Sequence, residues 1–216
     1  MGGAQNLGIA TGAFVEERDD WDAAVARAVS EGWRILELTA ITQDRLDALI
    51  PFLDRRLSAL GLFERVSIHA PSILRTSPRE MVTTLAALPP AFDIVVHPDT
   101  YRSQDSLVLL GRRLTFENMD NQKSFGRTVS DLRIVFDAHP QAGFCLDVAH
   151  CWTNDSSLRL AHEFLDSFGD RLRQLHISGI EQDGTHRPTT KADLDLYATV
   201  LARCKGVPWV LEAELV

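Results

Sequence analysis

Carboxylates and imidazoles occur in or just after several short apolar stretches of this sequence, and four of the seven histidines are among them. The residues are Glu37, His69, His97, Glu117, Asp147, His150, His176 and Glu212. Gathering such groups away from water is costly unless something neutralises their charge, and a divalent cation does so directly. Imidazole nitrogen and carboxylate oxygen, without a convincing cysteine, suit Zn, Mn, Co or Fe. We therefore expect a metal site.

The apolar stretches alternate with segments of helical period along the chain. We expect strands at 7–14, 35–38, 65–70, 93–97, 113–117, 143–147, 172–176 and 208–212, and helices at 19–30, 43–60, 78–88, 104–110, 127–138, 156–168 and 191–204. Eight strands separated by helices predict an α/β fold, a closed (β/α)8 TIM barrel with apolar strand interiors, whose carboxyl-terminal strand ends meet at one mouth. An open doubly wound sheet is the alternative.

The bulk composition limits the classes of function. The 216 residues, with 45% hydrophobic and 24% charged side chains, fit one domain over 1–216. The net charge of -8 works against tight binding of polyanions such as nucleic acid. No stretch resembles a signal peptide or a membrane span, and three unpatterned cysteines favour a reducing cytoplasm.

Six fragments in order along the chain resemble the xylose isomerase-like TIM-barrel superfamily, which includes sugar phosphate isomerases and epimerases and endonuclease IV (AP endonuclease family 2). The fragments are Ile68-His-Ala-Pro71, Val96-His-Pro98, Phe116-Glu-Asn-Met119, Cys145-Leu-Asp-Val-Ala-His150, Leu175-His-Ile-Ser178 and Val210-Leu-Glu212.

Resemblance to the isomerases and epimerases implies one divalent metal, Mn, Zn or Co, bound by Glu117, Asp147, His176 and Glu212. Glu117 and Glu212 would double as acid and base, and His150 would position a substrate oxygen. Such reactions remove a proton beside a carbonyl, pass through an enediolate and return the proton. We assign hydroxyl contacts of a sugar-like substrate to Glu37, His69 and Arg187. Trp152 either stacks on the sugar ring or covers the core, and the polar segment 181–188 either closes over a ligand or is a surface loop.

Resemblance to the endonuclease IV branch implies a zinc cluster that cleaves phosphodiesters. Its ligands would be His69, His97, Glu117, Asp147, His150, His176, His186 and Glu212. That branch places an Asp two residues before the residue that corresponds to His186, whereas Gly184 stands here and Asp183 is the nearest acid. The negative charge and short connections favour the small-molecule reaction.

A non-catalytic metal-binding barrel is the third hypothesis. The sequence stops four residues after Glu212, so no final helix follows the eighth strand. We expect an oligomer partner or neighbouring helices to cover that strand, unless the chain is a minimal or degenerate member of the superfamily.

Overall fold

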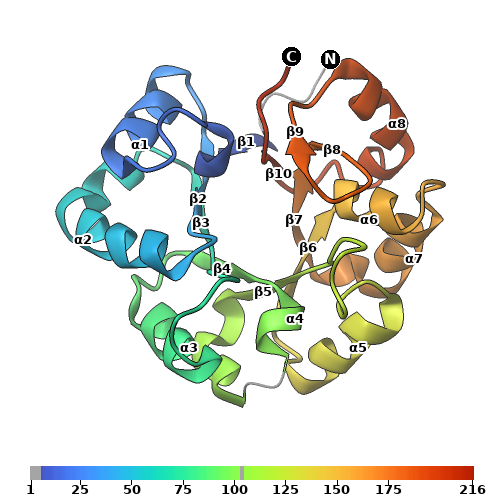
Figure 1. Cartoon of the computed structure of the whole chain (residues 1–216), viewed down its shortest axis with the longest axis horizontal. Coiled ribbons are helices and arrows are strands. Elements are labelled where there is room, and N and C mark those ends of the chain that lie inside the picture. The colour runs from blue at the N-terminus through green and yellow to red at the C-terminus, as the bar shows by residue number, and fades with distance from the viewer. Residues whose placement is uncertain (1–5, 103–104) are drawn as a thin grey trace.

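A closed barrel of eight parallel strands forms the centre of the computed structural model, which describes residues 6–102 and 105–216 (Figure 1). The strands are β1 Leu7–Ala10, β2 Ile35–Thr39, β3 Arg65–His69, β4 Asp93–Val96, β5 Leu114–Glu117, β6 Gly143–Asp147, β7 Leu172–Ile177 and β10 Trp209–Leu211. β1 pairs with both β2 and β10, which closes the barrel. The predicted TIM barrel is confirmed, and the open sheet is excluded.

Helices surround the strands (Figure 1). They are α1 Trp21–Ser30, α2 Gln43–Leu60, α3 Pro78–Ala87, α4 Pro98–Tyr101, α5 Val129–Ala138, α6 Val148–Asn154, α7 Arg159–Phe168 and α8 Lys191–Leu201. Short polar side chains begin most of the long ones; Thr42, Thr128 and Thr190, for example, each accept a hydrogen bond from a backbone N–H of the first turn. No described helix is long and apolar enough to cross a membrane.

Two parts of the helix prediction differ from the structure. The helix expected at 104–110 is a 3-10 segment, Asp105–Arg113, and residues 103 and 104 lie outside the described residues. Helix α6, which the sequence analysis did not predict, begins directly after β6, with the Asp147 side chain as its N-cap. This abrupt change from strand to helix turns His150 towards the barrel mouth.

The main apolar core lies between the barrel and the helices, where Phe116, Phe136, Phe144 and Phe168 pack edge-to-face or tilted against one another. The expectation of apolar strand interiors is wrong for the middle of this barrel. There Glu37 accepts hydrogen bonds from Ser67 on β3 and from Gln174 on β7. A small apolar cluster of Ala10, Ile35 and Val210 also lies among the barrel strands.

Neighbouring elements cover the last strand, β10, which no helix follows in the described part of the chain. Leu211 is 1% exposed, and Trp209 is half-buried and donates a hydrogen bond to the Cys204 carbonyl oxygen. The C-terminal segment then runs between α8 and α1, where Leu215 forms a bridge with Thr189 (Figure 1). Neighbouring elements thus cover β10, and oligomerisation stays a prediction.

Candidate metal centre at the barrel mouth

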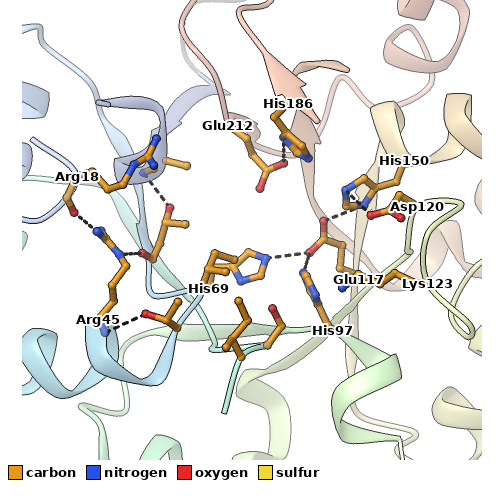
Figure 2. Close-up of a pocket in the computed structure, with 17 residues that line it drawn as sticks. Arg18, Arg45, His69, His97, Glu117, Asp120, Lys123, His150, His186 and Glu212 are labelled. Carbon is orange, nitrogen blue, oxygen red and sulfur yellow. Dashed lines mark hydrogen bonds and ion pairs between the residues drawn. The ribbon is translucent and has the colours of Figure 1, made fainter. Parts of the chain in front are cut away.

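A cavity of about 570 Å³ opens at the carboxyl-terminal ends of the strands (Figure 2). It is lined by Ala10, Gly12, Arg18, Thr39, Ile41, Thr42, Arg45, His69, Ser72, Ile73, His97, Glu117, Asp120, Lys123, His150, His186 and Glu212. Figure 2 shows Arg18 and Arg45 on one side and His69 in the middle; on the other side lie His97, Glu117, Asp120, Lys123, His150, His186 and Glu212. The cavity therefore joins a candidate metal-binding wall to a cationic wall.

Glu117, at the end of β5, lies at the centre of the imidazoles. Its Oε2 lies 3.0 Å from His69 Nε2 and 3.4 Å from His97 Nε2. Its Oε1 lies 3.1 Å from His176 Nδ1 and 3.5 Å from His150 Nδ1. Four strand-end histidines thus meet at one carboxylate, as the sequence predicted for the barrel mouth.

Ligand atoms gather in two groups that share Glu117, the atoms of each group lying within 4.8 Å of one another. The groups are His69, Glu117, His176 and Glu212, and Glu117, Asp147 and His150. Buried Asp147 Oδ2 and Glu212 Oε2 have no hydrogen-bond partner, which suits oxygens that bind a cation. Of the four ligands expected for one metal, Asp147 alone falls outside the first group.

Hydrogen bonds to backbone carbonyls determine which ring nitrogen of two histidines is free. His69 Nδ1 lies 3.1 Å from the Ala70 oxygen and donates to it, while Nε2 donates to Glu117 Oε2 at 3.0 Å. A cation at this wall would replace the Nε2 proton, because the bond to Ala70 keeps the other proton on Nδ1. His150 Nδ1 lies 2.9 Å from the Asn118 oxygen and likewise donates. His150 therefore presents Nε2, which lies 4.0 Å from Asp120 Oδ2. The bond to Asn118 makes His150 Nδ1 a poor ligand in the second group, and we expect His150 to act through Nε2.

The pKa values of the two carboxylates move in opposite directions. Burial raises the pKa of Glu117, but His176, His69 and His97 outweigh it and hold this pKa well below its ordinary value. Burial together with the negative charges of Asp147 and Glu117 raises the pKa of Glu212 well above its ordinary value, although His176 opposes them. The two carboxylates thus differ in how readily they bind a proton, a difference that acid–base catalysis uses.

The segment 181–188, expected to be a polar loop, forms the end of a hairpin of β8 Gly179–Ile180 and β9 His186–Arg187. The hairpin brings His186 Nδ1 to 3.6 Å from Glu212 Oε2. At its turn Gly184 has a φ of 85°, a left-handed conformation that favours glycine. Asp183 is exposed and accepts a hydrogen bond from Thr185, so it does not reach the metal-binding wall.

The structure does not bring three predicted substrate contacts to the cavity wall. Glu37 is 0% exposed and lies beside His176 inside the barrel. Arg187 makes two hydrogen bonds with Asp193 instead, and Trp152 packs against the apolar core. These positions contradict the assignments of Glu37 and Arg187 to hydroxyl contacts, and they favour the core-covering alternative for Trp152.

Four charged residues of the cavity were missed in the sequence analysis: Arg18, Arg45, Asp120 and Lys123. They lie in loops or at a helix start, where charged residues are common and no spacing singled them out. The sequence Glu117-Asn-Met-Asp120 was the one available signal, because a second acid follows the strand-end acid within a few residues.

Known structures share this architecture. A probable 3-DHS dehydratase involved in petrobactin synthesis from Bacillus anthracis is 14% identical, with a TM-score of 0.64, covering 96% of this chain and 92% of its own. A sugar phosphate isomerase/epimerase from Parabacteroides distasonis is also 14% identical, with a TM-score of 0.53 and coverages of 96% and 86%. A xylose isomerase-like TIM barrel protein from Mycobacterium smegmatis, in complex with magnesium, is 12% identical, with a TM-score of 0.53 and coverages of 98% and 91%.

The chain has the fold of the xylose isomerase-like TIM barrels. No protein-family model and no curated protein matches the sequence, so the likeness to these structures concerns the fold.

Proposed function

We propose that this xylose isomerase-like barrel is a divalent-metal-dependent isomerase or epimerase of a small sugar or sugar phosphate. The observation that carries the proposal is the pair Glu117 and Glu212. Both side chains approach His176, Glu117 at 3.1 Å and Glu212 at 3.3 Å, and their pKa values are shifted in opposite directions. The names of the structural neighbours, which include an isomerase/epimerase and a dehydratase, agree with this class of chemistry.

The residues that would hold the metal are His69, Glu117, His176 and Glu212, with Asp147 next to them. Their nitrogen and oxygen donors and the orphaned carboxylate oxygens fit Mn, Zn or Co. When bound, the ion would polarise the substrate carbonyl and stabilise negative charge on its oxygen.

The protein side chains would move the protons. Ionised Glu117 would accept the proton from the carbon beside the carbonyl, and the C–H electron pair would form the C=C bond of an enediolate. Glu212 would deliver a proton to carbon: the C=C pair would form the new C–H bond and one enediolate oxygen would re-form the C=O bond. In an isomerisation the hydroxyl proton would move to the other substrate oxygen. His150, through Nε2, would donate a hydrogen bond to or accept one from a substrate hydroxyl. Proton exchange with water would restore both carboxyl groups.

The cationic wall supports a phosphorylated substrate. Arg45 bonds to Asp19 at 3.1 Å and to backbone oxygens. Arg18 lines the cavity and forms no ion pair with the residues that the structure describes. An unpaired guanidinium opposite the metal-binding wall suits an anionic group on the far end of a sugar.

Isotope exchange tests this proposal directly. The protein is incubated in D2O with Mn²⁺ and a panel of aldoses, ketoses and their phosphates, and deuterium on carbon is measured by NMR. We expect deuterium at the carbon beside the carbonyl of at least one compound. Glu117→Gln should abolish the incorporation, whereas the same change at exposed Glu163 should not. Equal exchange in wild type and Glu117→Gln would refute the assigned base.

A metal-dependent phosphodiesterase is the second candidate. It is favoured by His97, His150 and His186, which line the same cavity and would be more ligands than a single metal ion requires. Asp120 adds a carboxylate beside His150, and it lies close to Gly184 on the hairpin. Cleavage of duplex DNA at an abasic site, without deuterium exchange into sugars, would establish this alternative. Metal binding without either reaction would support the third hypothesis, a non-catalytic metal-binding barrel.

The proposed partner is therefore a small molecule rather than nucleic acid. We also propose a cytoplasmic location, because Cys145, Cys151 and Cys204 are all free and buried, which suits a reducing compartment. Self-association would be tested by light scattering of the purified chain.

A further inference from the structure

Glu37 is a fully buried carboxylate in the middle of the barrel, which needs a reason because burying a charge is costly. Its Oε2 accepts hydrogen bonds from Ser67 Oγ at 2.8 Å and Gln174 Nε2 at 2.7 Å. Glu37 is thus a fixed acceptor that no substrate reaches.

The other oxygen of Glu37 lies against a candidate metal ligand. Oε1 is 3.0 Å from His176 Nε2, yet it is a buried oxygen without a hydrogen-bond partner of good geometry. His176 Nε2 has a second neighbour, Gln174 Nε2, also at 3.0 Å. An amide nitrogen donates and does not accept, so only Glu37 can take a proton carried by His176 Nε2.

The opposite ring nitrogen of His176 faces the metal-binding wall. Nδ1 lies 3.1 Å from Glu117 Oε1 and 3.3 Å from Glu212 Oε1. A histidine that binds a cation through Nδ1 must carry its remaining proton on Nε2. That proton would give the unpartnered Glu37 oxygen the donor it lacks.

We propose that Glu37 is a positioning residue for the metal: it accepts the Nε2 proton of His176 and so directs the Nδ1 lone pair at the cation. Without the carboxylate, the Gln174 amide can donate to Nε2 and hold the ring in the tautomer with a proton on Nδ1, which cannot bind a metal. The inference rests on the metal site of the proposed function but not on the reaction catalysed there.

Glu37→Gln tests this role, because it keeps the size of the side chain and replaces the acceptor with a second amide. Dissociation constants for Zn²⁺ and Mn²⁺ alone are measured by competition with a chromogenic chelator. We expect Glu37→Gln to weaken binding about 10–100-fold, the usual effect of losing such an outer partner. Ser67→Ala is the matched control: it removes a hydrogen bond from the other oxygen of Glu37 and should change the affinity less than about 3-fold. Glu37→Asp, which keeps a carboxylate, should recover part of the loss.

The tautomer itself can be observed by ¹⁵N-edited NMR of the Zn²⁺-loaded protein. We expect the proton of His176 on Nε2 in the wild type. Nε2 carrying no proton in the wild type would overturn the inference. So would equal metal affinity in wild type and Glu37→Gln, or equal losses in Glu37→Asp and Glu37→Gln, which a merely structural role would give. No metal binding by the wild type would overturn the proposed function as well, so the two failures are distinguishable.

Discussion

Replacing Glu117 by Gln should remove most of the thermal stabilisation that a divalent ion gives the protein. Glu117 approaches four histidines and belongs to both groups of candidate ligands. A ligand present at 100 times its dissociation constant stabilises a fold by about 2.7 kcal/mol. For a domain of this size that corresponds to a rise of about 5–11 °C in Tm. Loss of an outer partner weakens metal binding about 10–100-fold, so loss of this central charge should weaken it at least about 100-fold.

At the same ion concentration the variant would then gain only about 0.4 kcal/mol, or about 1–2 °C. The assay is thermal unfolding by circular dichroism, with and without Mn²⁺, Co²⁺ or Zn²⁺. Glu163→Gln, the same change on the exposed face of α7, should keep the full shift. A shift in Glu117→Gln as large as in the wild type would refute the placement of the metal at Glu117.

Three further predictions concern other parts of the chain. Gly8→Ala should destabilise the barrel by about 1–3 kcal/mol in urea unfolding, because its Cβ would lie 2.7 Å from a side chain of β2; Gly206→Ala, with nothing within 4 Å, should be nearly neutral. Hydrogen bonds from Arg187, together with those from Thr190, the N-cap residue of α8, lower the pKa of Asp193 to about 2. Asp193 should therefore add about 1–2 kcal/mol of stability above pH 4, and its difference from Asp193→Asn should shrink as pH falls towards 2; a constant difference would contradict the ion pair. Arg18→Ala should raise the half-saturating concentration of phosphorylated substrates about 10-fold, and leave unphosphorylated ones unchanged, in steady-state kinetics.

The strands and the central acids could be predicted because their signals are local. Each strand is a short apolar run, and the barrel rule then places residues at the ends of the runs together. This rule placed Glu117 and His176 at one mouth, the resemblance to the superfamily implied that they bind one metal, and the structure places them 3.1 Å apart. Asp147 was grouped with them for the same reason. In the structure, however, Asp147 Oδ1 accepts a hydrogen bond from the backbone N–H of His150 at the start of α6.

The parts that were missed depend on distances across the barrel. The assignment of Glu37 to a substrate hydroxyl came from its strand, but the sequence does not show that Ser67 and Gln174 point at it. The assignment of Arg187 to a substrate hydroxyl failed because of a residue close to it in the sequence. Asp193, six residues later in the first turn of helix α8, binds the guanidinium with both carboxylate oxygens. Only the folded geometry shows which charged side chains already have partners.

The metal content of the purified protein, measured by elemental mass spectrometry, tests the central claim most directly. The wild type, Glu117→Gln and His97→Ala are compared, because Glu117 belongs to the first group of ligands and His97 to neither group. We predict about one Mn, Co or Zn ion per chain, lost in Glu117→Gln and retained in His97→Ala. Two or three zinc ions lost in both variants would indicate a phosphodiesterase centre, and a metal-free protein that also fails to bind added ions would contradict the metalloenzyme altogether.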